Sequence, residues 1–296
     1  MGRVTRREFI KSSVAVAVGT AGGVVVPAKA ARRSATDWVK LGNSGVEVTR
    51  LAFGTGTYAG RVQRELGQAE FTRLVRHAYD RGIRFFESAD AYGEMHEMLA
   101  VALKGLPRDS YRLMTKIRWR SDEAPEAAID RFRKELNSDY FDILLMHCLR
   151  TSGWGDELKE LQDKLSEAKH KQVILAHGAS CHGLLPLRDF PGANWLDVAL
   201  LRVNHNGTLM DNLKDETKVK GDVQEVVGHI AKVHEQGTGV IGMKLIGEGA
   251  FKTPEERDAS LRFVLNLGTV DAVTIGYKST AEIDEAIERI DHHLNA

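Results

Sequence analysis

The alternation of two kinds of segment constrains the fold of this 296-residue chain most strongly. Short apolar runs rich in Val, Ile, Leu and Phe alternate with longer segments whose apolar residues recur at helical spacing, a pattern typical of strand–helix units around a parallel sheet. The predicted strands are Arg50–Phe53, Phe85–Glu87, Arg112–Thr115, Ile143–Met146, Val173–Ala176, Val198–Val203, Gly239–Met243 and Ala272–Ile275. The predicted helices are Gln68–Arg81, Glu94–Leu103, Pro125–Leu136, Glu157–Ala168, Leu184–Asp189, Val223–Gln236, Pro254–Leu267 and Ala281–Leu294.

Eight such units favour an α/β fold in which the strands close into a (β/α)8 barrel, the TIM barrel. An open dinucleotide-binding sheet is less favoured, because no Gly-x-Gly-x-x-Gly stands between the first strand and its helix. Ahead of that strand, Val39–Leu41 and Val46–Thr49 flank Gly42-Asn43-Ser44-Gly45, which predicts a β-hairpin over the barrel bottom. We therefore expect one domain over residues 31–296, with its site in the loops that follow the strands.

The first thirty residues predict an export signal rather than part of the fold. Arg6-Arg7 lies within Thr5–Lys11, an apolar run follows at Val14–Val26, and Ala28–Ala30 offers small residues for cleavage. The run is shorter than the roughly 20 residues of a transmembrane helix, so no stable membrane anchor is expected. The paired arginines indicate the twin-arginine route. The resulting expectation is passage through the twin-arginine translocase to the periplasm or the extracellular space.

Composition excludes two further classes of protein. The 41 Lys and Arg residues balance 41 Asp and Glu residues and are scattered among them, so no basic surface for nucleic acid is expected. Only Cys148 and Cys181 are present, which excludes a scaffold built on disulfides. A single bridge between these two cysteines is geometrically conceivable, because they follow neighbouring strands.

Polar residues follow three consecutive predicted strands. Glu87 and Tyr92 stand at the end of the second strand, Lys116 at the end of the third and His147 at the end of the fourth. In a closed barrel these ends face one mouth, so a carboxylate, a phenol, an ammonium and an imidazole should meet there. Such a set is suited to proton transfer.

The segment Glu87-Ser88-Ala89-Asp90-Ala91-Tyr92-Gly93 resembles the Asp-x-Ala-x-x-Tyr-Gly motif of the aldo-keto reductases, whose next two strands contribute a Lys and a His. The resemblance implies that Tyr92 protonates a carbonyl oxygen as hydride arrives from a nicotinamide, or acts as the base in the reverse direction. It further implies that Lys116 lowers the pKa of Tyr92 and that His147 orients the carbonyl. Glu87 replaces the family's Asp and displaces the carboxylate by about 1.5 Å, so we expect the pocket to adjust around it.

The same resemblance implies a bound NAD(P), and the exported location predicts that it is held tightly. Cys181, Arg202 and Met243 stand where the family has an Asn, a Gln and an aromatic residue. Glu282 stands where NADPH-selective members place an Arg, which puts a preference for NADP in question. The residues expected to hold the cofactor are Gly56, Thr57, Ser180, Cys181, Arg202, Met243, Lys244, Gly276, Lys278 and Ser279.

The implied substrate is a small carbonyl or alcohol compound, such as a sugar. Two alternatives stay open at this point. The departures from the family motifs are compatible with a non-catalytic periplasmic binding protein on the same barrel. A metal-dependent lyase or isomerase could use Zn or Fe held by Cys148, His177, Cys181, His182 and His205 beside His147. No metal is expected, because histidines at a barrel mouth more often orient polar substrates. The aromatic candidates for lining the cleft are Tyr58, Trp119, Trp154 and Trp195.

Overall fold

The apolar runs form the parallel strands of a closed barrel, in the order β10-β3-β4-β5-β6-β7-β8-β9. This computed structural model describes residues 32–118, 122–214, 216 and 218–296, so the predicted signal in residues 1–30 lies outside the described part. All described strands and helices belong to the unit Arg33–Ala296. The barrel strands are β3 (Leu51–Gly54), β4 (Phe85–Glu87), β5 (Arg112–Ile117), β6 (Phe141–Leu149), β7 (Ile174–Cys181), β8 (Val198–Arg202), β9 (Gly239–Met243) and β10 (Ala272–Gly276).

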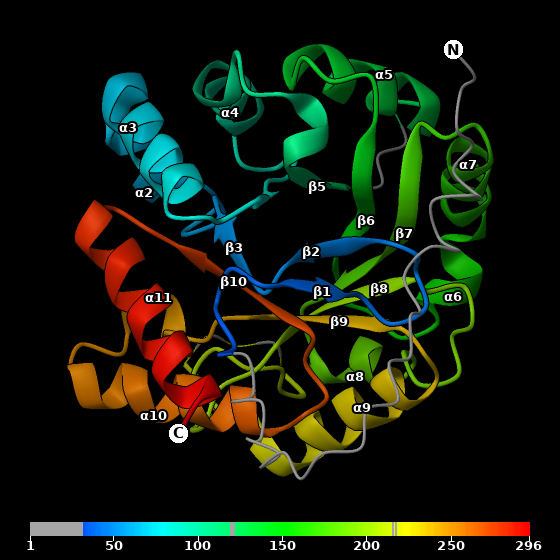
Figure 1. Cartoon of the computed structure of the whole chain (residues 1–296). Helices are drawn as coiled ribbons and strands as arrows, with labels where there is room; N and C mark the ends of the chain where they lie inside the picture. The colour runs from blue at the N-terminus through cyan, green and yellow to red at the C-terminus, as the bar shows by residue number, and fades with distance from the viewer. Residues whose placement is uncertain (1–31, 119–121, 215, 217) are drawn as a thin grey trace, which may run out of the picture. The chain divides into compact units, whose positions relative to one another are not determined.

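Helices follow the strands and surround the barrel, as Figure 1 shows. In α3, for example, Phe71, Leu74, Val75 and Ala78 recur at helical spacing and are all buried against the strands. The helices are α2 (Arg61–Glu65), α3 (Gly67–Asp80), α4 (Met95–Leu103), α5 (Pro125–Glu135), α6 (Trp154–Glu157), α7 (Lys159–His170), α8 (Leu184–Leu187), α9 (Val223–Glu235), α10 (Pro254–Asn266) and α11 (Thr280–Leu294). The predicted (β/α)8 fold is confirmed.

The predicted hairpin is confirmed as well and crosses one opening of the barrel (Figure 1). Strands β1 (Trp38–Lys40) and β2 (Glu47–Thr49) pair antiparallel. Apolar side chains from this segment, Leu41 and Val48 among them, join the cluster that fills the barrel interior. Between the strands, Gly42 has φ +47° and lies so close to Gly237 that a Cβ would overlap its carbonyl, so only glycine fits. With this end of the barrel covered, the loops at the carboxyl ends of the strands are left for the site.

Strands β6 and β7 run beyond their predicted ends and contain an irregularity. Met146 pairs with Ala179 and Leu149 pairs with Cys181, so β6 holds one residue more than β7 over this stretch. Cys148 adopts a left-handed φ of 63° in this bulge, and its N–H donates to Ser180 Oγ at 2.8 Å. Bulges re-aim neighbouring side chains, and here the affected neighbour is His147. Within the described residues, no helix has the length and apolar character to cross a membrane.

Candidate active site

A cavity of about 760 Å³ opens among the loops that follow the strands. Glu87, Tyr92 and His147 line it over the barrel mouth. The same cavity continues over the loops after β3, β9 and β10 and along α10 and α11, where Lys278 and Glu282 line it. One long cavity therefore extends from the predicted proton-transfer residues to the start of α11.

Glu87 and Lys116 form a buried ion pair beneath the cavity. The Lys116 ammonium donates to the Glu87 carboxylate and, at 2.7 Å, to the carbonyl oxygen of Ser88. The exposed fractions are 1% for Lys116 and 4% for Glu87, so the two charges stabilise one another away from water. Room for the longer carboxylate side chain comes from Gly54, where a Cβ would stand only 3.1 Å from Glu87 Oε2. The pocket is thus shaped to hold Glu at this position.

Tyr92 lies between the ion pair and the imidazole of His147. Lys116 Nζ is 4.8 Å from the centre of the Tyr92 ring, and the His147 ring packs edge-on at a centroid distance of 5.5 Å. The glycine loop passes directly beside the phenol, since a Cβ on Gly56 would approach the hydroxyl oxygen to 2.7 Å. The structure therefore brings Tyr92, Lys116, His147 and Glu87 together at one mouth.

The electrostatics of Tyr92 correct one expectation from the sequence. Burial, followed by the Glu87 carboxylate, raises the pKa of Tyr92 well above its ordinary value of 10.0. The net shift of the Tyr92 pKa is therefore upward, whereas the sequence predicted a lowered pKa, and Lys116 is itself paired with Glu87. Burial in turn lowers the pKa of Lys116, against the opposing effect of Glu87. The phenol is therefore protonated at neutral pH, as a proton donor must be.

His147 is held as a neutral imidazole. Burial lowers its pKa to about 4, and Asp90 opposes that shift. Its Nδ1 lies 3.6 Å from Asp90 Oδ1, while Asp90 Oδ2 accepts the Arg118 backbone N–H at 3.2 Å. Sequence reasoning missed this role of Asp90, although the residue stands two positions before Tyr92 in the motif. Asp90 therefore faces His147 at a distance longer than a hydrogen bond and acts on its ring through charge.

A second imidazole, His182, faces the cavity together with Arg202. The Arg202 guanidinium donates to His182 Nδ1 and lies 3.4 Å from the buried Asp211 carboxylate. A guanidinium cannot accept a hydrogen bond, so Nδ1 must be the unprotonated nitrogen of His182. Burial and the charge of Arg202 lower the pKa of His182, which keeps this ring neutral with its proton on Nε2. The cavity thus contains a second uncharged hydrogen-bonding imidazole.

Most of the predicted cofactor residues line the cavity, and three do not. Those that line it are Gly56, Thr57, Arg202, Met243, Lys244, Gly276 and Lys278. Ser279 caps α11 instead, where its Oγ accepts the Glu282 N–H at 3.3 Å. Ser180 is 1% exposed and is used by the β6 bulge, and Cys181 is fully buried. Because β7 extends to Cys181, both side chains lie within the strand rather than in the loop after it.

The cysteines and histidines are dispersed rather than clustered. Cys148 and Cys181 are free thiols, so the conceivable bridge is not formed. Cys181 Sγ donates to the Gly183 carbonyl oxygen at 3.2 Å. His177 stacks on Trp195 at a centroid distance of 4.3 Å. Across residues 32–118, 122–214, 216 and 218–296, no three His, Cys, Asp or Glu side chains are placed to hold a metal ion.

Tyr58 is the aromatic candidate that lines the cavity. Trp154 instead packs on Phe190. Trp119 lies outside the described residues.

A polar contact joins two loops of the cavity lining that sequence reasoning had not connected. Glu248 Oε1 accepts the Tyr58 backbone N–H at 2.8 Å and lies 2.9 Å from Lys244 Nζ. Tyr58 belongs to the loop after β3, while Lys244 and Glu248 belong to the loop after β9. The carboxylate therefore connects the two loops at the cavity lining.

Comparison with known proteins places this geometry in a family. The profile described as "Aldo/keto reductase family" matches residues 50–296. A probable aldo-keto reductase 1 from Glycine max is 31% identical over 155 residues, covering 48% of this chain and 45% of the relative. An L-galactose dehydrogenase from Arabidopsis thaliana is 30% identical over 141 residues, covering 44% of each chain. The chain thus spans less than half the length of these two relatives.

Solved structures show the same fold. A putative aldo-keto reductase from Pseudomonas aeruginosa superimposes with a TM-score of 0.71 at 20% identity, covering 89% of this chain and 98% of that one. The holo form of an aldo-keto reductase from Bacillus halodurans gives a TM-score of 0.67 at 16% identity, covering 87% and 94%. With its family profile matched from the first barrel strand to the C-terminus, this chain belongs to the aldo/keto reductase family.

Proposed function

We propose that this protein is an NAD(P)-dependent oxidoreductase that interconverts a carbonyl and an alcohol, with Tyr92 as the proton donor in reduction. The observation that carries the proposal is the meeting of Tyr92 with His147 and the Glu87–Lys116 pair at the cavity. Membership of the aldo/keto reductase family supports the same chemistry. Neither alternative from the sequence is favoured, because the described histidines and cysteines form no metal site and the proton-transfer groups are assembled.

The residues along the cavity fit a dinucleotide. Gly56 lets the backbone pass beside Tyr92, and at Gly276 a Cβ would overlap Thr57 Oγ1, so both positions leave room close to the main chain. Lys278, which lines the cavity just before α11, carries an exposed ammonium group, and Lys244, paired with Glu248, lines the same cavity. Together these features suit a pyrophosphate and its two nucleosides. A bound nicotinamide would supply the hydride.

The remaining steps belong to the protein's own side chains. Tyr92 donates its proton to the substrate oxygen as negative charge develops there, which its raised pKa permits at neutral pH. The neutral imidazole of His147 orients that oxygen by a hydrogen bond, and Asp90 faces the ring. Lys116 and Glu87 keep the phenol in place from below. In the alcohol-oxidising direction only the Tyr92 phenolate can accept the alcohol proton, so the raised pKa favours reduction at neutral pH.

The substrate is proposed to be a polar carbonyl or alcohol compound such as a sugar. His182 and Arg202 line the cavity with His147, which provides hydrogen-bonding groups for several hydroxyls. The similarity to a protein named L-galactose dehydrogenase agrees with this class.

The experiment is a panel of sugars and aldehydes assayed with NADH and NADPH, using the chain from residue 31 onward. Tyr92→Phe should lower kcat between about 100- and 10,000-fold while nucleotide binding is retained. Tyr58→Phe, which alters a phenol elsewhere on the cavity lining, is the matched control and should keep kcat. Turnover that survives in Tyr92→Phe would contradict the proposal.

Export and tight retention of the cofactor are proposed together. The paired arginines and the apolar run at the N-terminus support twin-arginine export to the periplasm or beyond, and replacing Arg6-Arg7 by two lysines should abolish export. The contact of Glu248 with Tyr58, which connects two loops of the cavity lining, supports slow release of a nucleotide bound there. Nucleotide should therefore appear in solution when the purified protein is denatured, and Glu248→Gln should release it faster than the wild-type chain does. Denatured protein that yields no nucleotide would argue against tight retention.

A further inference from the structure

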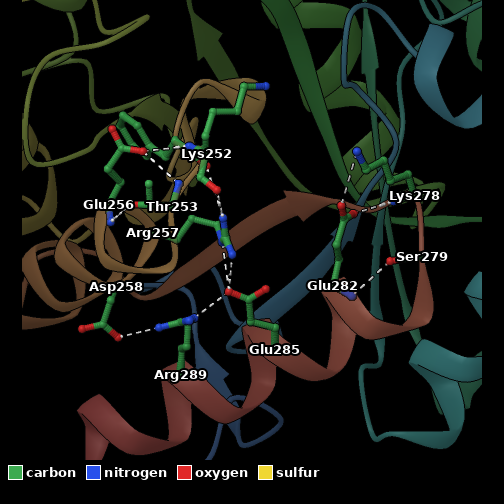
Figure 2. Close-up of polar contacts among 11 residues, drawn as sticks. Lys252, Thr253, Glu256, Arg257, Asp258, Lys278, Ser279, Glu282, Glu285 and Arg289 are labelled. Carbon is green, nitrogen blue, oxygen red and sulfur yellow. Dashed lines mark hydrogen bonds and ion pairs between the residues drawn. The ribbon is translucent and has the colours of Figure 1, made fainter.

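The two ends of the cavity present different polar groups to a bound molecule. At the outer end, Arg257 and Arg289 both donate to the Glu285 carboxylate, as Figure 2 shows. At the inner end, beside the proposed proton donor, the lining includes the imidazoles of His147 and His182. Burial lowers the pKa of each ring, so both are neutral. The two imidazoles therefore offer uncharged hydrogen-bonding groups, which suit the uncharged oxygens of a carbonyl and a hydroxyl.

His182 lies near His147 because their strands, β7 and β6, are neighbours in the barrel. The His182 backbone N–H donates to the Leu149 carbonyl oxygen at 2.8 Å, and Leu149 stands two residues after His147 on β6. Neighbouring strands are about 4.8 Å apart. Two hydrogen-bonding groups separated by about one strand spacing can bind two oxygens on adjoining carbons, each from its own side.

One buried carboxylate fixes His182 at both its backbone and its ring. Asp211 Oδ1 accepts the backbone N–H of Gly183 at 2.8 Å and lies 3.4 Å from Arg202 Nη1. Arg202 in turn donates from Nη2 to Nδ1 of His182. Asp211 is fully buried, which strengthens both contacts by keeping water away from them. The loop after β8, which carries Asp211, thereby sets the position of a side chain that follows β7.

This network also decides which nitrogen of His182 carries the proton. Because Nδ1 accepts from Arg202, the hydrogen of the neutral ring is on Nε2. Within the part of the chain that the structure describes, no protein group accepts a hydrogen bond from this Nε2. His182 is half-buried and lines the cavity, so its Nε2–H is a donor available to a bound molecule.

We propose that His182 makes the site selective for carbonyl compounds that carry a hydroxyl on the carbon next to the reacting carbonyl. Its Nε2–H donates to that hydroxyl oxygen while His147 holds the carbonyl oxygen. Asp211 is a positioning residue that acts on His182 through Arg202 and Gly183. The inference rests on the proposed function, since it requires carbonyl reduction at this site. It goes further by naming the substrate group that is recognised and the side chain that recognises it.

The test compares substrates that differ only in that hydroxyl. D-glyceraldehyde is paired with 3-hydroxypropanal, and D-galactose with 2-deoxy-D-galactose, each reduced at saturating NADH or NADPH. The wild-type chain should prefer the hydroxylated member by at least about tenfold in kcat/KM. His182→Leu should bring that ratio close to one, and His182→Gln, which keeps an N–H donor, should retain part of the preference. Because the ratio compares two substrates on one preparation, any loss of folded protein cancels from it.

Further variants separate recognition from a purely structural role. His170→Leu makes the same change at an exposed position on α7 away from the cavity lining, and should leave the ratio unchanged. Asp211→Asn should lower the ratio several-fold, mainly through a higher KM for the hydroxylated member. Nitrogen-15 NMR of histidine-labelled protein should show His182 protonated on Nε2, and Arg202→Met should allow the form protonated on Nδ1 to appear. A His182 ring that keeps the Nε2–H form in Arg202→Met would contradict the positioning network.

The outcomes distinguish the inference from the proposed function. Equal kcat/KM for both members of each pair in the wild-type chain overturns the inference and leaves the proposed function standing. A preference that His182→Leu retains also overturns it. So does a His182→Leu variant whose only defect is weaker binding of NADH and NADPH, because the imidazole would then serve the nucleotide. Failure to reduce any sugar or aldehyde overturns the proposed function itself.

Discussion

At the scale of single residues, the candidate site depends on how burial sets the charge of each group. Lys116 is buried and keeps its charge through Glu87, whereas His147 is buried and neutral. The pKa of Tyr92, which lies beside both residues, is raised, so its protonated form is favoured. These are the states required for donating a proton to a carbonyl oxygen, and burial is the largest cause of the pKa shift of both Tyr92 and His147.

The raised pKa of Tyr92 predicts how reduction depends on pH. A proton donor is active below its pKa and fails as pH rises through it. Because burial and Glu87 raise that pKa above 10.0, kcat/KM for carbonyl reduction should stay level up to pH 10.0. The measurement is a pH profile of reduction in mixed buffers, with protein integrity checked at each pH by circular dichroism. An alkaline fall centred near pH 8 in intact protein would contradict this assignment.

The Glu87–Lys116 pair predicts a large effect on stability. Glu87→Gln leaves an ammonium group in an environment where Lys116 is 1% exposed, so unfolding in urea should show a loss of about 3–5 kcal/mol. Replacing both residues, as Glu87→Gln with Lys116→Met, should regain part of that loss because no charge remains buried. Thr274→Val removes only the 3.5 Å contact to Glu87 Oε2 and serves as the uncharged control. If Glu87→Gln and the parent chain had the same free energy of unfolding, the Glu87–Lys116 ion pair would not contribute to stability.

At the scale of elements, the sequence predicted the order of strands and helices better than their ends. Strands β4 and β9 match their predicted ranges. Strands β6 and β7 were predicted too short, because His147 and His177 resemble residues of the loops after strands. Helices α2 and α6 were missed, since five and four residues are too few to show a helical period.

The candidate site was predictable where a side chain lies at or near the carboxyl end of a strand. Tyr92, Lys116 and His147 needed only the barrel topology to be brought together. The role of Ser180 was not predictable, because it depends on the extra residue in β6 and on a backbone N–H that the bulge leaves unpaired within the sheet. The role of Glu248 was not predictable either. One partner, Tyr58, lies far away in sequence, and the other, Lys244, is reached through a turn of irregular backbone.

Ser180 offers a prediction about the bulge. Ser180→Ala leaves the Cys148 N–H without its acceptor, which should cost about 1–3 kcal/mol of stability. His147 directly precedes that N–H, and a displacement of about 1 Å can lower a rate up to about 100-fold, so kcat should fall more than KM changes. Thr238→Val is the control: it removes the 3.0 Å hydrogen bond to the Leu196 carbonyl oxygen at the other end of the barrel. Thr238→Val should lose a similar amount of stability and keep the kcat of the parent chain. If Ser180→Ala also kept the parent kcat, a role for the bulge in catalysis would be contradicted.

At the scale of the whole described unit, the barrel separates stability from chemistry along its axis. The hairpin covers one end and adds Leu41, Val46 and Val48 to the interior cluster. The cavity with Tyr92 and His147 opens among the loops at the carboxyl ends of the strands. Changes at the hairpin should therefore alter the free energy of unfolding without altering the reaction.

Leu41→Ala tests that separation. Leu41 is fully buried, so truncating it should cost about 2–5 kcal/mol in urea unfolding through lost burial and the space left behind. Its kcat/KM, assayed well below the midpoint of thermal unfolding, should equal that of the parent chain, because Leu41 itself does not line the cavity. Val101→Ala, at a position that is 51% exposed, is the control for loss of methyl groups and should change neither quantity measurably. If kcat/KM falls for Leu41→Ala under conditions where the variant is fully folded, packing in the barrel interior must link the hairpin to Tyr92. The proposed separation of stability at one end of the barrel from catalysis at the other would then be wrong.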